Sequence, residues 1–140
     1  MTIWFKEISI EMLNQRGNNT MAEFLDIQFI EVGENFLVAT MPVTNRTKQP
    51  IGILHGGANV VLAETVASTA ANAVVDPERF YCVGLEINAN HIRSVKDGIV
   101  TAKAIAIHLG RTTQIWQTNI YNTEGKMTCT SRMTASVLSK

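Results

Sequence analysis

The chain has 140 residues, which suits one domain, because domains commonly contain about 100 to 150 residues. Its 12 basic and 12 acidic side chains cancel, so no bulk positive field favours binding to nucleic acid or to an anionic membrane. No apolar run approaches the roughly 20 residues of a membrane span, and the N-terminus shows no secretion signal. We therefore expect a single cytoplasmic domain over residues 1–140.

The first third of the chain predicts small elements. Ser9 is placed to cap a short helix that ends at Gly17, and a short apolar turn follows over 21–25. Alternating apolar residues then predict strands over 27–30 and 36–41, joined by a turn at Gly33.

Residues 42–54 show no periodicity and contain two prolines. So long a connection is uncommon in a small domain and tends to be functional. The helix predicted next, over 57–75, is rich in Ala and Val and carries Glu64 as its only formal charge. A helix that is apolar on nearly every side belongs at the centre of a fold.

Four strand-like runs follow, over 80–91, 99–109, 112–122 and 127–138, separated by short turns that contain glycine. Strands joined by such turns are antiparallel neighbours. The pattern predicts an α+β fold with five to six antiparallel strands wrapped around one long helix. Cys82 and Cys129 lie in apolar stretches without metal-ligand spacing, and we expect two buried free thiols.

Glu64 is the most informative polar residue, because burying an unpartnered carboxylate costs several kcal/mol by typical estimates. Ser68 and Asn72 follow it at successive intervals of four residues, so the three share one helix face. That face is either a solvated stripe of the helix or the polar wall of a pocket.

His55, Gly56 and Gly57 precede the long helix, where free backbone N–H groups and the positive end of the helix dipole favour a developing oxyanion. Together with an amide donor from the loop at Gln49 and the acid at Glu64, they provide the groups of an acyl-transfer hydrolase. There is no Gly-x-Ser-x-Gly motif, and the three histidines lack metal-ligand spacing.

Two stretches, 49–64 (QPIGILHGGANVVLAE) and 83–94 (VGLEINANHIRS), resemble the hotdog-fold acyl-CoA thioesterases. The similarity runs from Trp4 to Leu138. It is closest to the branch of bacterial 1,4-dihydroxy-2-naphthoyl-CoA hydrolases of menaquinone synthesis and enterobactin-pathway proofreading thioesterases. The resemblance implies a hotdog fold, hydrolysis of an aromatic acyl-CoA without metal or cofactor, and homodimers that pair into homotetramers.

The resemblance also implies residue roles. Glu64 matches the catalytic carboxylate, Gly56 and Gln49 match the donors to the thioester carbonyl, and His55 and Ser68 match assisting positions. Further positions match those that bind CoA, namely Asn90, His91, Arg93 and Arg111. Asn59 departs from the family, whose members often have Ser there, and we expect it to tune packing or the acyl pocket.

The spacing of Gly56 and Glu64 predicts a shared site. Eight residues of helix separate them by about 12 Å, and a glutamate side chain recovers only about a third of that distance. Both groups must approach one carbonyl carbon to roughly 3 Å. Two antiparallel helices related by a twofold axis meet this need, with Gly56 of one chain facing Glu64 of the other.

Two other functions remain open at this stage. A hotdog dehydratase would use His55 with a carboxylate on a hydroxyacyl thioester, although its motif lacks this Gln-loop and Glu64 combination. A non-catalytic acyl-CoA-binding module would bind the same ligands without releasing thiol.

Overall fold

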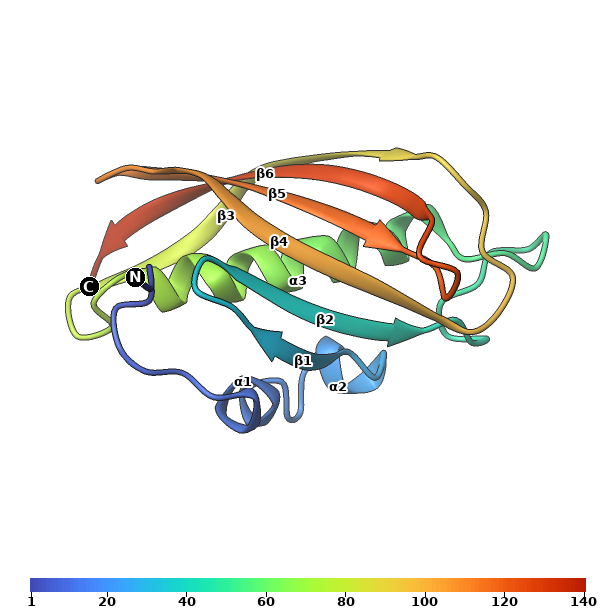
Figure 1. Ribbon diagram of the computed structural model, residues 1–140, viewed down its shortest axis with the longest axis horizontal. Coiled ribbons are helices and arrows are strands. Elements are labelled where there is room, and N and C mark those ends of the chain that lie inside the picture. Colours follow the sequence, from blue (N-terminus) through green and yellow to red (C-terminus); the bar gives the residue numbers. More distant parts are fainter.

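Nine elements follow one another along the chain, and the computed structural model describes residues 1–140. Two short helices lead into a β-hairpin, then come a long helix and four strands (Figure 1). Their bounds are α1 Ile10–Arg16, α2 Met21–Phe24, β1 Gln28–Val32, β2 Phe36–Pro42, α3 Gly56–Val74, β3 Phe80–His91, β4 Ile99–Leu109, β5 Thr113–Tyr121 and β6 Met127–Ser139.

All strands belong to one six-stranded sheet with the order β1-β2-β4-β5-β6-β3, and every neighbouring pair is antiparallel. The sheet curves over α3, which lies along its inner face (Figure 1). This arrangement confirms the predicted α+β architecture. The predicted strand and helix ranges differ from the observed bounds by at most two residues, which is the usual uncertainty at the ends of elements.

The apolar composition of α3 follows from its position inside the sheet. Leu62 and Val66 have no exposed surface and belong, with Trp116, to one core of 27 buried residues. Burying a side chain of this size stabilises the fold by about 1.5 to 3 kcal/mol. Small residues let the strands approach the helix closely, and the buried alanines of α3 are Ala58, Ala63, Ala67, Ala70, Ala71 and Ala73.

The N-terminal segment forms the predicted short helix. The Ser9 hydroxyl accepts a hydrogen bond from the backbone N–H of Met12 at 3.2 Å, and Leu13 buries its side chain in the core. The segment predicted as an apolar turn is the four-residue helix α2 instead. The Thr20 hydroxyl explains the difference, because it caps this helix by accepting from Ala22 N at 3.2 Å.

Cys82 and Cys129 are both free and buried, which confirms the prediction of two unpaired thiols. Desolvation by burial raises the pKa of each thiol above its ordinary value of 9.0.

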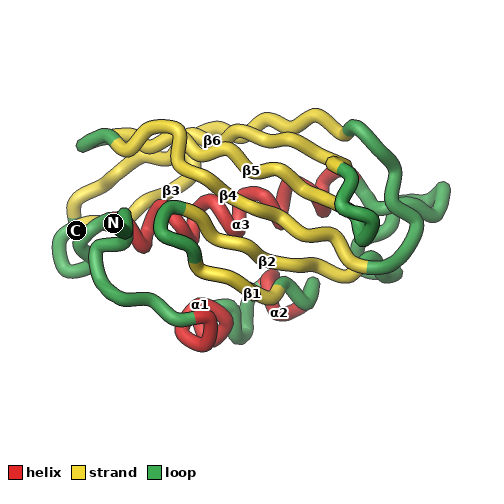
Figure 2. Tube along the Cα trace, in the orientation of Figure 1, coloured by secondary structure: helices red, strands yellow, loops and turns green.

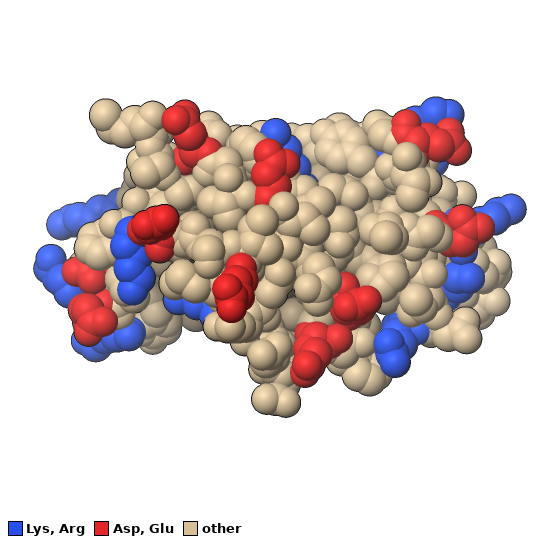
Figure 3. All heavy atoms as spheres, turned by 60° about the horizontal axis from the view of Figure 1, so that its bottom comes forward, with Lys and Arg blue, Asp and Glu red and all other residues tan.

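The surface shows no field of one charge. Acidic and basic side chains are interspersed on the face drawn in Figure 3, as expected from a formal net charge of zero. None of the helices combines the length and the apolar character that crossing a membrane requires.

One end of the molecule gathers the loops that matter for the site. The connection from β2 to α3 (residues 43–55) and the connection from β3 to β4 (residues 92–98) both lie there (Figure 2). They are tied together by a backbone hydrogen bond of 2.7 Å from Leu54 N to Val95 O.

Candidate active site

The N-terminus of α3 presents a free backbone donor. His55 is its N-cap, and the imidazole Nδ1 accepts a hydrogen bond of 2.8 Å from Gly57 N–H. The N–H of Gly56 has no hydrogen-bond partner within the chain. Because it also lies at the positive end of the helix dipole, it is suited to bind a carbonyl oxygen that gains negative charge.

The loop before α3 carries Gln49 to the same place. It is folded back on itself by hydrogen bonds from Gln49 N to Ile53 O at 2.8 Å and from His55 N to Thr47 O at 2.7 Å. The Gln49 side-chain oxygen accepts from Ile51 N at 2.9 Å, and its NH₂ group makes no hydrogen bond within the chain. The long connection is therefore ordered, and it leaves an amide donor free beside the helix end.

A cleft of about 330 Å³ opens at this end of the molecule, a volume within the usual range for small-molecule sites. The structure brings together here five residues that the sequence had singled out, four as site residues and Asn59 as a departure from the family. The cleft is lined by Gln49, Ile53, Leu54, Gly56, Asn59, His91, Ile92, Arg93, Ser94 and Val95. Arg93 is held at it by a hydrogen bond of 2.6 Å from Nη1 to Met127 O.

Glu64 lies eight residues after Gly56, about two turns further along α3, and does not line this cleft. It is half-buried, and its carboxylate has no hydrogen bond or ion pair within the chain. The carboxylate packs over Gly84 of β3 so closely that a Cβ atom there would lie 2.3 Å from Glu64 Oε1. A single chain thus holds a free backbone N–H and a free carboxylate at separate places.

A β-bulge in β3 turns both parts of the site toward the helix. The register shifts between Gly84 and Glu86, which leaves Leu85 as the extra residue. Gly84 packs against Glu64 and His91 packs against Gly56, although an even and an odd position of a regular strand face opposite sides. The bulge is what allows both residues of β3 to face α3.

Ser68 and Asn72, the polar residues that follow Glu64 on the same helix face, make contacts within the chain. The Ser68 hydroxyl donates to the sulfur of Met133 at 3.5 Å. The Asn72 side chain bonds both backbone groups of Cys82, donating to its oxygen at 3.0 Å and accepting from its nitrogen at 2.8 Å. Asn72 therefore fastens β3 to α3, and this helix face is a contact surface for β3 and β6 as well as a partly solvated face.

Two expected CoA-binding residues do not join the cleft within one chain. Asn90 faces away from α3 and lines an outer depression with Asn88, Gln117 and Arg132. Arg111 lies in the turn between β4 and β5. The register of the sheet places this turn near the end of β3 that contains Val83, whereas His91 lies at the other end of β3.

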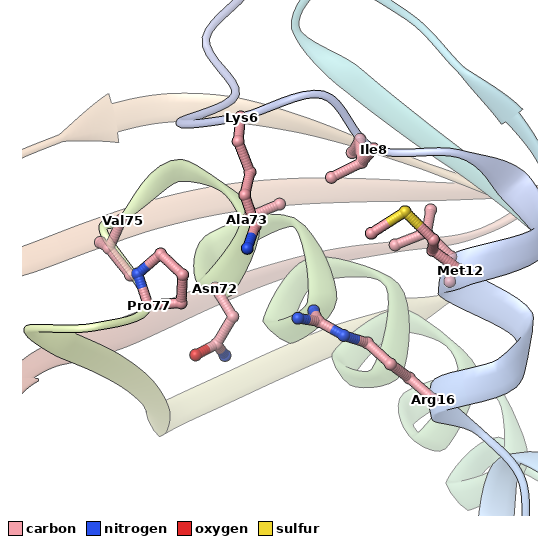
Figure 4. Close-up of a pocket in the computed structure, with 9 residues that line it drawn as sticks. Lys6, Ile8, Met12, Arg16, Asn72, Ala73, Val75 and Pro77 are labelled. Carbon is pink, nitrogen blue, oxygen red and sulfur yellow. The ribbon is translucent and has the colours of Figure 1, made fainter.

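A second pocket lies between α1 and the C-terminal end of α3, where Lys6 and Arg16 reach toward Asn72 (Figure 4). Its volume of about 20 Å³ is sufficient for roughly one water molecule. It is too small for an acyl group, and the cleft beside Gly56 is the candidate site because it contains the free backbone N–H and Gln49.

Two contacts that shape the site were not identified from the sequence, that of Gly84 with Glu64 and that of Asn59 with His91. Gly84 leaves room for Glu64, and a glycine inside a strand is a signal that another group approaches the backbone closely. Asn59 was expected to tune packing or the acyl pocket, and its Nδ2 lies 3.2 Å from His91 Nδ1. No sequence pattern indicates that contact, because 32 residues separate the two.

Known proteins are similar to this chain over nearly its whole length. The family model described as "Thioesterase superfamily" matches residues 51–129. The Escherichia coli K12 protein named 1,4-dihydroxy-2-naphthoyl-CoA hydrolase is 48% identical over 97% of this chain and 99% of its own. The EntH proofreading thioesterase of Cronobacter sakazakii is 42% identical over 97% of this chain and 98% of its own.

Solved structures agree with these matches. A crystal structure of the Pseudomonas aeruginosa thioesterase PA1618 carrying a Q49A substitution is 45% identical, with a TM-score of 0.98 and coverage of 99% of this chain and 100% of its own. The Haemophilus influenzae thioesterase HI1161 is 46% identical, with a TM-score of 0.96 and coverage of 99% and 96%. The chain therefore belongs to the thioesterase superfamily, has the hotdog fold, and is a thioester hydrolase.

Proposed function

We propose that the protein hydrolyses aromatic acyl-CoA thioesters, including 1,4-dihydroxy-2-naphthoyl-CoA, at sites shared between the two chains of a homodimer. The observation that carries the proposal is the free Gly56 N–H at the end of α3, together with an unpaired Glu64 on the same helix. The names of the Escherichia coli and Cronobacter relatives support the substrate class.

The Gly56 N–H polarises the thioester carbonyl, and the free NH₂ group of Gln49 is the second donor. Donors of this kind are worth about 3 to 4 kcal/mol in the transition state. His55 has a positioning role, because its bond to Gly57 N–H fixes the first turn of the helix.

Glu64 acts either as the nucleophile or as the general base. Either its carboxylate attacks the carbonyl carbon, expels CoA thiolate and leaves an anhydride that water hydrolyses, or it removes a proton from a water that attacks directly. Both routes consume one water and release a carboxylic acid and CoA thiol. After a single turnover in heavy-oxygen water, label in the Glu64 carboxylate identifies an anhydride whose Glu64 carbonyl is attacked by water, because the general-base route does not exchange these oxygens.

The edge strand β3 supports the dimer. It pairs with β6 on one side only, so its other side offers unpaired backbone groups along 12 residues. Glu64 lies against Gly84 of this strand, and Gly56 lies against His91. Antiparallel pairing of two β3 strands about a twofold axis near Ile87 sets Gly84 of one chain opposite His91 of the other, which unites the two half-sites.

A mixing experiment tests the shared site. We expect the double variant Gln49→Ala/Gly56→Pro and the variant Glu64→Ala to be inactive separately, and their heterodimers to regain one intact site of two. Subunit exchange is followed by mass spectrometry with one chain isotope-labelled. Confirmed exchange without recovered turnover would contradict the shared site.

Binding of the nucleotide and further assembly belong to the same proposal. His91 and Arg93 line the cleft and would contact CoA near the entrance. Twofold pairing also brings the end that carries Arg111 toward the cleft of the second chain, and Asn90 lies on the strand that pairs.

Exposed apolar side chains on the outer face of the sheet, Ile105 and Ile107 among them, support pairing of dimers into homotetramers. Light scattering should give two or four times the 15.4 kDa of one chain.

Thiol release from a panel of aryl-CoA and alkyl-CoA esters tests the activity itself. We expect hydrolysis, with aryl esters preferred. Binding without thiol release would indicate a non-catalytic acyl-CoA-binding module, and an enoyl product from a 3-hydroxyacyl thioester would indicate a dehydratase.

A further inference from the structure

His91 is held between two residues of the first turn of α3. Its Nε2 atom lies 2.8 Å from the position that a Cβ on Gly56 would occupy, so the ring edge rests on the glycine. Its Nδ1 atom lies 3.2 Å from Nδ2 of Asn59. All three residues line the cleft.

The contact with Asn59 determines which ring nitrogen carries the proton. With Nδ2 of Asn59 facing the ring, Nδ1 of His91 is the acceptor, because an amide NH₂ group only donates hydrogen bonds. In the neutral imidazole one nitrogen is a donor and the other an acceptor, and the proton therefore sits on Nε2. The N–H bond of the ring is then on the side that faces Gly56.

Asn59 is not placed there to stabilise the fold. Its side chain is 5% exposed, and its Oδ1 atom is buried without a hydrogen-bond donor. A buried acceptor without a partner destabilises a protein, whereas an apolar residue of similar size would not. An asparagine kept at this position at a cost in stability points to a role at the cleft.

We propose that the Nε2–H of His91 is a further donor to the thioester carbonyl, beside the Gly56 N–H, and that Asn59 is the positioning residue that fixes this tautomer. The inference deepens the proposed hydrolysis and rests on it for the identity of the acceptor. It gives His91 a part in charge stabilisation, besides its expected place at the CoA entrance. Because Nε2 lies over Gly56, a carbonyl oxygen bound to the glycine N–H is also within reach of the ring.

The first test reads the tautomer without using activity. Nitrogen NMR of the ¹⁵N-histidine protein at pH about 9, where an ordinary imidazole is neutral, should show His91 protonated at Nε2. In Asn59→Asp, a carboxylate that only accepts should move the proton to Nδ1. His55, whose Nδ1 accepts from Gly57 N–H, is the internal control and should not change. Protonation of Nδ1 in the unsubstituted protein would overturn the proposal.

The second test is a double-mutant cycle on thiol release. We expect His91→Ala to lower kcat by about 100-fold, the typical loss for one oxyanion donor, and Asn59→Asp to lower it by at least about tenfold with little change in KM. In the His91→Ala background, Asn59→Asp should lower kcat by no more than about twofold, because its effect passes through the ring. Losses that multiply independently would contradict the positioning role.

Asn59→Leu guards against an effect of the new charge or a folding defect. It removes the donor without adding a carboxylate, so it should also lower kcat, and only when His91 is present. If Glu64→Gln retains full activity, the proposed hydrolytic mechanism fails, while the NMR measurement still decides the tautomer. The two failures are therefore distinguishable.

Discussion

Replacing Gly84 by Ala should move the Glu64 carboxylate and leave the fold intact. The new Cβ would lie 2.3 Å from Glu64 Oε1, whereas ordinary contacts of this kind begin at 3.4 Å. The carboxylate must therefore retreat by about 1 Å. It is the end of a flexible side chain, so this movement requires a new rotamer and no change of backbone. The other contact of the Cβ, with Met133 Sδ at 3.8 Å, is an ordinary one.

The expected loss of activity follows from this displacement. A misplacement of about 1 Å in a reacting group costs roughly 100-fold in rate. The free energy of unfolding should change by less than about 1 kcal/mol, because alanine is favoured over glycine in a strand by a similar amount and offsets the rotamer cost. KM should hardly change, since no residue of the cleft is altered.

Steady-state thiol release gives kcat and KM, and urea unfolding gives the stability. Gly17→Ala is the matched control. Gly17 has a φ of −77°, and its Cβ would only touch Ala22 and Asn14 at 3.4 Å, so activity and stability should both persist. Wild-type kcat in a folded Gly84→Ala protein would refute the catalytic assignment of Glu64 or the contact between the two residues.

Three further expectations concern the site acid, a buried polar network and the thiols. Glu64→Gln should lower kcat by orders of magnitude while calorimetry still detects binding of a CoA ester, and near-normal turnover would contradict its role. Gln114→Leu should lower the free energy of unfolding by about 1 to 3 kcal/mol, measured in urea, because Trp116 Nε1 loses its 2.9 Å acceptor inside the core. Burial raises the pKa of Cys82 and Cys129 above 9.0, so the unfolded chain releases these protons first and stability should fall as pH rises above about 9. Urea unfolding between pH 7 and 10.5 should show this fall, which should be smaller in the Cys82→Ala/Cys129→Ala protein.

The fold could be predicted from periodicity because the apolar pattern of most elements agrees with the structure that they form. The strand runs after Phe80 are separated by short turns. The helix that carries Glu64 has no other charged residue, so it lacks a charged face that would lie on the protein surface. These features left one arrangement, a sheet around a helix, and the structure has it. The helix α2 was missed because four residues are too few to show a helical period.

Residue spacing predicts the candidate site only where neighbours in the sequence are also neighbours in space, whereas His91 and Arg93, which line the same cleft, were expected from the family resemblance. Gln49 and Gly56 are close along the chain, and the loop and helix bring them to one cleft. The contacts of Glu64 with Gly84 and of Asn59 with His91 join α3 to a strand that begins after the helix ends. They depend on the register of β3, and the bulge that shifts this register has no sequence pattern of its own beyond the glycine.

That bulge also explains why one edge strand serves two chemically different half-sites. If β3 were regular over these seven residues, without the bulge at Leu85, Gly84 and His91 would face opposite sides of the sheet, and only one of the two could reach α3. With it, the strand makes room for the acid at one point and sets a ring against the oxyanion donor seven residues later. Because both contacts lie along the open edge of the sheet, a second β3 strand pairing there in antiparallel orientation would set each half-site against its complement. Under the proposed pairing, a chain that keeps its acid and its donor apart would be inactive alone and complete as a pair.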